Sequence, residues 1–328
     1  MKNRLEELLD SYAETDGLSC CLLVARDGEV VYERSRGVAD PETGAPLTPR
    51  SAFNLASVTK PFTALCVLQL AERGLLELDD EVRNWLPEAP CEGATVRHLL
   101  THTSGLPEYF DYYEKCFSRD RILHNHDVLE MLRAEKPALK FAPGEAYDYC
   151  NTGYVFLALI VEAAGGRSLA DHMVREVITP VGMDDAFPFE FGQPERPGTV
   201  RGFELTDNGR RLKSLGKMDG TFGDGNLYAS ITDLRKWADA LARGELLEPD
   251  RLEEAFVPFR PTGGGGSICG LGWRVDPEEG FVWHTGSWAG SRNYVRFGRG
   301  RTPDAFLLSN SSFGKRDALV ESLNAILS

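Results

Sequence analysis

The two ends of the chain share a pattern of short apolar runs that predicts β-strands. Near the start, the runs at 19–25 and 29–35 are separated by Arg26 and an Asp27-Gly28 pair, which is typical of a β-hairpin. Near the end, four similar runs are parted by Gly, Pro and Asp, and they cover 271–275, 281–285, 293–297 and 305–309. We therefore expect an antiparallel sheet to which both ends of the chain contribute.

Between these ends, apolar residues recur at spacings of three and four, which predicts helices. The segments with this spacing are 61–74, 152–166, 169–180 and 231–244. The last of them can be capped by Ser230 or Thr232 and ended by Gly244. A charged amphipathic helix is predicted at 1–14, and another at roughly 316–327.

This order of elements predicts an α+β fold. Strands at both ends place the two termini in one antiparallel sheet, flanked by the N- and C-terminal helices, with a mostly helical region inserted between its edges. We expect a single unit over 1–328, with a sheet region formed by 1–56 and 215–328 and a mainly helical region at 57–214. The glycine run 263–266 is too short for an interdomain linker, so a flexible loop is predicted there.

Composition excludes several classes of function. The formal net charge is −14 and no cluster of Lys and Arg occurs, so no nucleic-acid partner is expected. No apolar stretch approaches the roughly 20 residues of a membrane span, and the charged N-terminus lacks the apolar region of a signal peptide. We expect a cytoplasmic protein, unless a leader has been removed. The 7 cysteines are an odd number without CxxC spacing, and we interpret them as reduced core thiols.

Ser57 and Lys60 are the first candidates for catalysis. They lie just before the apolar segment 61–74, which Pro61 helps to start, and residues three apart on a helix share a face. A serine hydroxyl is a poor nucleophile until a base takes its proton, and a desolvated lysine can be that base. The alternative is that Ser57 is only a helix cap.

The same spacing of serine and lysine occurs at two other places in the chain. These are Ser214 with Lys217 and Ser312 with Lys315. Only Ser57 precedes a long apolar helix, so we interpret the other two pairs as accidental.

Tyr149-Cys150-Asn151 is the second candidate, and it is the only Tyr-x-Asn in the chain. It lies after a turn at 143–145 and directly before a predicted helix. A tyrosine whose pKa is lowered by a nearby ammonium can shuttle protons, and an asparagine can hydrogen-bond both a substrate amide and a lysine. The alternative is that Tyr149 is a core aromatic residue and Asn151 a helix cap.

His284, Thr285, Gly286 and Ser287 form the third candidate, at the end of the strand predicted at 281–285. Gly286 lets a substrate lie against the strand edge, and the next backbone amide can point at an oxyanion. The alternative is an ordinary strand that ends in a turn.

These three motifs, in this order, resemble those of the serine β-lactamase and penicillin-binding-protein-like family. The similarity is to the branch with Tyr-x-Asn in the middle, which holds class C β-lactamases, DD-peptidases, D-aminopeptidases and family VIII esterases. Further similar stretches extend the resemblance from about residue 20 to 310, and they include 95–108, 147–169, 223–241 and 283–297.

The resemblance implies a role for each candidate residue. Ser57 would be the acylated nucleophile and Lys60 its base or proton relay. Tyr149 would be the second proton shuttle, which also activates the deacylating water. Asn151 would orient the substrate and the Lys60 side chain, and the backbone amides of Ser57 and Ser287 would form the oxyanion hole.

The sequence departs from the family pattern at two positions, His284 and Cys150, and the first of them narrows the expected function. The resemblance implies that His284, Thr285, Gly286 and Ser287 bind substrate. Trp288 follows the oxyanion position, so we expect it to line the acyl pocket, and the alternative is that it is a core or rim aromatic residue. Many penicillin-recognising members have lysine in place of His284, and a largely neutral imidazole binds a substrate carboxylate less strongly. The second departure is Cys150, which we interpret as a small filler residue, and the alternative is that its thiol inhibits the enzyme when it is oxidised.

We therefore expect a serine hydrolase that acts on small esters or amides through an acyl-enzyme on Ser57, as an esterase or a D-amino-acid amidase or peptidase. The alternative within enzymes is a β-lactamase or DD-peptidase, and the alternative of another class is a non-catalytic binding or scaffold protein on the same fold. The partner would be a small ester, amide or peptide substrate. The sequence does not predict an oligomeric state.

No cofactor or metal is expected. His98 and His102 are four apart, but Leu99 stands where a zinc protease would need glutamate. The glycine-rich segment 220–226 lacks the Lys-Ser/Thr ending of a phosphate-binding loop, so it does not predict a nucleotide site.

Overall fold

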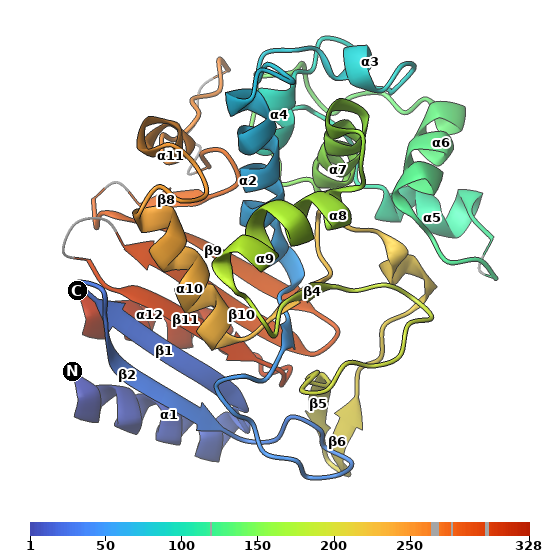
Figure 1. Ribbon diagram of the computed structural model, residues 1–328. Helices are drawn as coiled ribbons and strands as arrows, with labels where there is room; N and C mark the ends of the chain where they lie inside the picture. The colour runs from blue at the N-terminus through green and yellow to red at the C-terminus, as the bar shows by residue number, and fades with distance from the viewer. Residues whose placement is uncertain (119, 264–268, 277, 299–301) are drawn as a thin grey trace.

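A six-stranded antiparallel sheet forms the centre of the protein, in the order β2-β1-β11-β10-β9-β8 (Figure 1). The computed structural model describes residues 1–118, 120–263, 269–276, 278–298 and 302–328. The strands are β1 (Cys20–Arg26), β2 (Glu29–Arg36), β8 (Arg274–Asp276), β9 (Phe281–Trp288), β10 (Ser291–Gly298) and β11 (Asp304–Ser309). The expectation that both ends of the chain build one antiparallel sheet is confirmed.

β1 shows how the strand pattern divides the core into two layers. Its alternate residues Cys20, Leu22 and Val24 pack against the terminal helices, whereas the residues between them pack into the main core. Successive strand residues point to opposite faces, so a central strand covered on both faces is apolar throughout. The β1–β2 hairpin turns at Asp27 and Gly28, which have φ of 52° and 82°. Positive φ at both turn residues matches the twist of the flanking strands.

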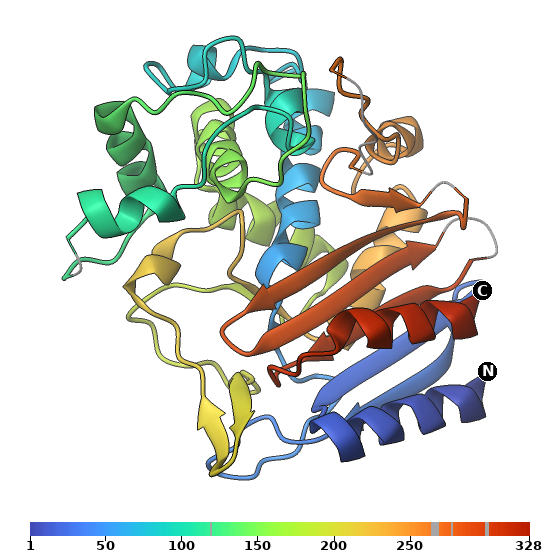
Figure 2. The same ribbon diagram turned by 180° about the vertical axis from the view of Figure 1, so that it is seen from behind.

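Helices cover both faces of the sheet. Seen from behind in Figure 2, α1 (Lys2–Asp16) and α12 (Arg316–Leu327) lie side by side across one face. On the other face, α10 (Ile231–Ala242) packs against the sheet in Figure 1. The rings of Phe62 and Trp237 stack with centroids 4.1 Å apart, so α10 also contacts the central helix of the inserted region.

The inserted helical region is built around two buried helices, α2 (Thr59–Glu72) and α7 (Asn151–Gly165). The other helices are α3 (Val82–Trp85), α4 (Val96–Leu100), α5 (Phe110–Cys116), α6 (Asn125–Glu135), α8 (Leu169–Met173), α9 (Thr179–Val181) and α11 (Pro249–Ala255). Within the described ranges, no single helix has the length and hydropathy of a membrane span. The pair Asn151–Gly165 and Leu169–Val181 meets that criterion only when taken together across a 74° bend.

Short strands connect the two regions. β3 (Phe53–Asn54), β7 (Leu227–Ala229) and β4 (Phe187–Pro188) form a small sheet beside the start of α2. β5 (Phe203–Thr206) and β6 (Gly209–Leu212) form a separate hairpin. Since β3 leads directly into Ser57, this small sheet holds the segment that presents the candidate nucleophile.

Several predicted elements differ from the structure. The strand predicted at 271–275 begins only at Arg274, because Gly272 has φ of 85° and a Cβ there would lie 2.3 Å from Cβ of Ala64. The helix predicted at 169–180 contains a π-helical segment between α8 and α9. Cys116 is exposed, whereas the other cysteines are buried. Apart from its first residue, the loop predicted at 263–266 lies outside the described residues.

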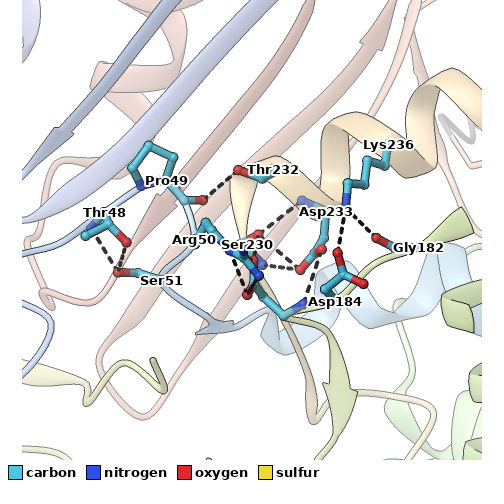
Figure 3. Close-up of polar contacts among 11 residues, drawn as sticks. Thr48, Pro49, Arg50, Ser51, Gly182, Asp184, Ser230, Thr232, Asp233 and Lys236 are labelled. Carbon is cyan, nitrogen blue, oxygen red and sulfur yellow. Dashed lines mark hydrogen bonds and ion pairs between the residues drawn. The ribbon is translucent and has the colours of Figure 1, made fainter. Parts of the chain in front are cut away.

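A polar network at the start of α10 fixes the chain that leads into β3 (Figure 3). Ser230, one of the two predicted caps, accepts a hydrogen bond from the Asp233 backbone, and the Asp233 carboxylate accepts one in return from the Ser230 backbone. This reciprocal arrangement is a capping box. The Thr232 hydroxyl donates to the carbonyl of Pro49 at 3.1 Å. The network therefore ties the segment before the nucleophile to the start of α10.

Candidate active site

Ser57 lies in a strained turn between β3 and α2. The turn is a short 3-10 helix, Ala56–Val58, and Ala56 has φ of 50°. A non-glycine residue is rarely found in this left-handed region without support. The support comes from Asn54, whose side-chain Oδ1 accepts from the Ala56 backbone N–H at 2.8 Å. This local geometry places the Ser57 side chain on the wall of a cleft.

Lys60 lies beneath Ser57 and is fully buried. Its Nζ donates to Asn151 Oδ1 at 2.8 Å and to the carbonyl of Asp224 at 2.7 Å, and it lies 3.3 Å from Ser57 Oγ. A buried amine is stable only if its N–H groups are hydrogen-bonded. In the described part of the chain these partners are all neutral groups, so no carboxylate directly contacts the amine.

Tyr149 stands on the same cleft wall as Ser57. Its ring centroid lies 5.0 Å from Lys60 Nζ and 5.9 Å from the guanidinium carbon of Arg274. The ring also stacks on His102, with centroids 4.4 Å apart and planes 29° apart. His102 accepts at Nδ1 from the backbone N–H of Cys150 at 3.1 Å, so it holds the Tyr-x-Asn segment in place. The ring of Tyr149 is therefore held close to Lys60, on the same cleft as Ser57.

His284 lies on β9, behind Tyr149, and only 3% of it is exposed. The ring centroids of His284 and Tyr149 are 6.4 Å apart. Nδ1 of His284 donates to the carbonyl of Thr285 at 2.7 Å, which leaves Nε2 as an acceptor in the neutral ring. Burial, together with the nearby positive charge of Lys60, lowers the pKa of His284 to about 3. The imidazole is therefore neutral at neutral pH.

The buried histidines should make the folded protein less stable in acid. Burial lowers the pKa of His284 to about 3 and that of His102 well below its usual value. In the unfolded chain, each histidine takes up a proton near pH 6.5. Below about pH 6.5 the unfolded state therefore binds more protons, and stability falls by up to about 1.4 kcal/mol per pH unit for each histidine.

We expect urea unfolding to show a smaller loss of unfolding free energy between about pH 7 and pH 4 in His284→Asn than in the wild type. The exposed His126 offers a matched control, and His126→Asn should keep the wild-type slope. Equal slopes in the wild type and His284→Asn would contradict a neutral buried imidazole.

Gly286 allows β9 to pass beside the nucleophile turn. A Cβ on Gly286 would lie 2.1 Å from the carbonyl oxygen of Leu55 and 3.2 Å from Cβ of Ala56. Any larger residue would push the strand away from the turn that carries Ser57. The glycine therefore brings the next residue, Ser287, to the cleft wall.

Trp288 forms the outer edge of the cleft, with 37% of its surface exposed. Its ring stacks on Phe110 with centroids 5.8 Å apart, and Nε1 donates to the carboxylate of Asp219. Tyr109 adds a further aromatic wall. Aromatic rings therefore form part of the cleft wall beside Trp288.

The cleft has a volume of about 240 Å³. Of the predicted site residues, Ser57, Tyr149, Asn151, Ser287 and Trp288 line it. The side chain of Lys60 lies beneath Ser57, and that of His284 lies behind Tyr149. Thr285 and Gly286 follow on β9 without lining it. A larger cavity of about 300 Å³ lies on the other side of the β9–β10 turn, and its lining contains none of the predicted catalytic residues. The residues that line the smaller cavity, rather than its volume, therefore identify it as the candidate active site.

The two other serine and lysine pairs have different partners. Lys217 donates to the carbonyl of Asp120 at 2.9 Å, and Lys315 forms an ion pair with Asp16 at 3.0 Å. Neither lysine hydrogen-bonds the serine three residues before it in the described residues, which agrees with their interpretation as accidental.

The structure adds residues that sequence reasoning did not single out. Asp224 supplies a carbonyl to Lys60, and its carboxylate accepts from the Tyr109 hydroxyl at 3.1 Å. Glu108 accepts two hydrogen bonds from Asn151. His102, considered above only as a metal ligand, is a packing partner of Tyr149. All of these residues lie in or directly after the stretches 95–108 and 223–241, which carry the family resemblance. That resemblance was the signal from which the sequence could have indicated them.

Fold and site together define a class of protein. A serine and a lysine at the start of a buried helix, a Tyr-x-Asn at the start of another buried helix and a strand that carries His-Thr-Gly beside them resemble the arrangement of penicillin-recognising serine hydrolases, with His284 in place of the more usual lysine. The chain belongs to the beta-lactamase family, whose profile matches residues 5–325.

Three relatives illustrate the range of the family. Penicillin-binding protein 4* of Bacillus subtilis (strain 168) is 35% identical over 303 residues, which cover 88% of this chain and 67% of that protein. Esterase EstB of Burkholderia gladioli is 33% identical over 304 residues, which cover 82% of this chain and 77% of that protein. The solved structure of a penicillin binding protein from Bacillus halodurans covers 99% of this chain and 100% of its own, with a TM-score of 0.86 and 26% identity. The predicted family and fold class are confirmed.

Proposed function

We propose that the protein is a serine hydrolase that cleaves small esters or amides through an acyl-enzyme on Ser57. The observation that carries this proposal is the position of Lys60 Nζ, 3.3 Å from Ser57 Oγ and hydrogen-bonded to Asn151 and Asp224. A neutral amine has two N–H groups and one lone pair. When the N–H groups bond to Asn151 and Asp224, the lone pair can accept the Ser57 proton.

The first chemical step is acylation. Ser57 Oγ attacks the carbonyl carbon of the substrate while Lys60 takes the hydroxyl proton. The backbone amides of Ser57 and Ser287 stabilise the negative charge on the carbonyl oxygen. Tyr149, beside Lys60, passes a proton to the leaving group, and the bond to that group breaks.

Deacylation uses the same groups in reverse. A water molecule attacks the ester carbon of the acyl-enzyme, and Tyr149 takes its proton. The Ser57 oxygen leaves and regains a proton from Lys60. Neither step requires a cofactor.

The surroundings of the cleft favour acyl donors without a carboxylate. His284 carries no positive charge at neutral pH, since its pKa is about 3. The aromatic walls formed by Tyr109, Phe110 and Trp288 suit an apolar acyl or aryl group. Neutral esters and amides therefore rank above β-lactams as substrates.

One observation favours a second candidate, a β-lactamase or DD-peptidase. Arg316 donates to Ser287 Oγ and forms an ion pair with Asp317 at 2.7 Å, while the half-buried Arg292 lines the same hollow and has no carboxylate partner among the described residues. Both arginines line a hollow that adjoins Ser287. A carboxylate on the substrate could bind there.

Two measurements test the proposal. A fluorophosphonate should form one adduct on Ser57, detected by mass spectrometry of the digested protein. The kcat/KM for p-nitrophenyl butyrate or D-alanine amide should exceed that for nitrocefin by about tenfold or more, which corresponds to about 1.4 kcal/mol of transition-state stabilisation.

The other outcomes have definite meanings. Faster turnover of nitrocefin, lost in Arg316→Ala, would replace the first candidate with the second. Absence of any adduct would favour a non-catalytic scaffold.

A further inference from the structure

Glu108 is a carboxylate next to the site that the proposed mechanism does not use. Its Oε1 accepts two hydrogen bonds from Asn151, one from the backbone N–H at 2.8 Å and one from the side-chain Nδ2 at 3.0 Å. Its Oε2 is buried and has no hydrogen-bond partner within the described residues. Within the described residues, the Glu108 carboxylate therefore accepts hydrogen bonds only from Asn151.

These contacts determine which way the carboxamide of Asn151 faces. A carboxamide can be turned to present either its oxygen or its NH₂ group. An ionised carboxylate only accepts hydrogen bonds, so Glu108 requires the NH₂ end. The oxygen end then faces Lys60 Nζ, at 2.8 Å. In the reversed orientation, Asn151 would present its oxygen to Glu108 and an N–H to the lysine lone pair.

The surrounding charges link Glu108 to Lys60. Burial raises the pKa of Glu108, while the Asn151 backbone N–H and the charge of Lys60 act to lower it. The other groups that act on Glu108 are Asp224, which raises its pKa, and Lys140, which lowers it. Glu108 also lies at the N-terminus of α7, where a negative charge is favoured. Lys60 and Glu108 are therefore opposite ends of one hydrogen-bonded chain through Asn151.

The segment around Glu108 is held in place without its carboxylate. The Thr152 hydroxyl donates to the carbonyl of Pro107 at 2.7 Å and accepts from the backbone N–H of Tyr109 at 2.8 Å. The thiol of Cys150 lies 3.3 Å from the carbonyl of Leu106. Both neighbours of Glu108 are thus tied to the first turn of α7, so removal of the carboxylate should leave the segment in position.

We propose that Glu108 is a positioning residue for the Ser57 reaction, which acts through Asn151 on Lys60. It holds the carboxamide oxygen toward Lys60, and this in turn directs the lysine lone pair at Ser57. Its negative charge favours the protonated form of the lysine that results from proton transfer. The inference rests on the proposed function.

Glu108→Ala and Glu108→Gln separate the two parts of this role. Glu108→Ala should lower kcat/KM for p-nitrophenyl butyrate by about 100-fold, mainly through kcat, because a misplaced catalytic group costs about this much. In Glu108→Gln the amide oxygen can still accept both hydrogen bonds, so the rate should stay within about tenfold of the wild type. Because Glu108→Gln removes the negative charge, the acidic limb of the pH profile of kcat/KM should move to lower pH in this variant.

A double-mutant cycle tests whether Glu108 acts through Asn151. In an Asn151→Ala background, Glu108→Ala should cause no further loss beyond about threefold. Asp111→Asn is a matched control, because Asp111 is exposed, lies three residues away and loses the same charge. It should keep the wild-type profile.

A multiplicative loss in the double variant, an unchanged rate in Glu108→Ala or an unmoved acidic limb in Glu108→Gln overturns the proposal. If Glu108→Ala does not melt cooperatively, Glu108→Gln and its combination with Asn151→Ala decide the outcome. The rate of fluorophosphonate labelling separates this inference from the proposed function. No adduct on wild-type Ser57 rejects both, whereas equal labelling rates in the wild type and Glu108→Ala reject only the role of Glu108.

Discussion

Replacement of Ser57 with alanine is expected to lower kcat/KM for a p-nitrophenyl ester by at least about 10⁴-fold. The variant lacks the hydroxyl oxygen that the proposed mechanism acylates, while the cleft walls and backbone amides stay in place. In the described residues, Ser57 Oγ has one hydrogen-bond partner, Lys60 Nζ at 3.3 Å. Its removal should therefore change the free energy of unfolding by no more than about 1 kcal/mol.

The measurement is release of p-nitrophenol by the purified variant, with thermal unfolding in parallel. Ser214→Ala is a matched control, because Ser214 also stands three residues before a lysine and is exposed. It should retain wild-type kinetics. Residual activity of Ser57→Ala above about 1% of the wild type, with a fluorophosphonate adduct elsewhere, would show that another residue is the nucleophile.

Replacement of Lys60 with methionine should lower kcat by about 10³-fold, within the range that a general base contributes. Methionine fills similar space but cannot take the Ser57 proton. Removal of a buried amine relieves a desolvation cost, but it also leaves Asn151 Oδ1 and the Asp224 carbonyl without their donor. The two effects oppose each other, so the melting temperature should change much less than the rate.

Steady-state kinetics and calorimetry on Lys60→Met check this expectation. Lys217→Met is the matched control, since Lys217 stands three residues after a serine but donates to the carbonyl of Asp120. A loss of less than about tenfold in Lys60→Met would mean that Tyr149 rather than Lys60 takes the serine proton.

Much of the fold could be predicted because it depends on short-range periodicity. Alternation along Cys20–Arg26 and the spacing of three and four along Asn151–Gly165 each follow from the geometry of one element. The strand predicted at 271–275 is longer at its start than the observed strand, because contact with a neighbouring helix determines where the strand begins. Gly272 lies too close to Ala64 of α2 for a regular strand. The residues around Gly272 in the sequence do not indicate this contact, because Ala64 is far away along the chain.

In the candidate site, too, some features follow from the local sequence and others depend on residues far apart in the chain. The pairing of Ser57 with Lys60 is a property of one helical turn, so their spacing, together with the apolar helix that follows, was sufficient to single them out. The proximity of Tyr149 and His284 to that pair was inferred from the family resemblance. The burial of His284 was not foreseen, and it strengthens the argument from charge, since a buried imidazole with a pKa of about 3 is neutral throughout the physiological range.

The sequence alone determined most of the strands at the chain ends, the longest helices between them and the spacing of Ser57 and Lys60, because these depend on residues a few positions apart. Only the tertiary structure decided what surrounds the lysine. Its contact with Asp224 joins residues 164 positions apart, and that of Asn151 with Glu108 joins residues 43 apart. Such contacts form only when segments far apart in the sequence pack together, so hydrogen-bond partners, burial and charge at the site are properties of the assembled fold.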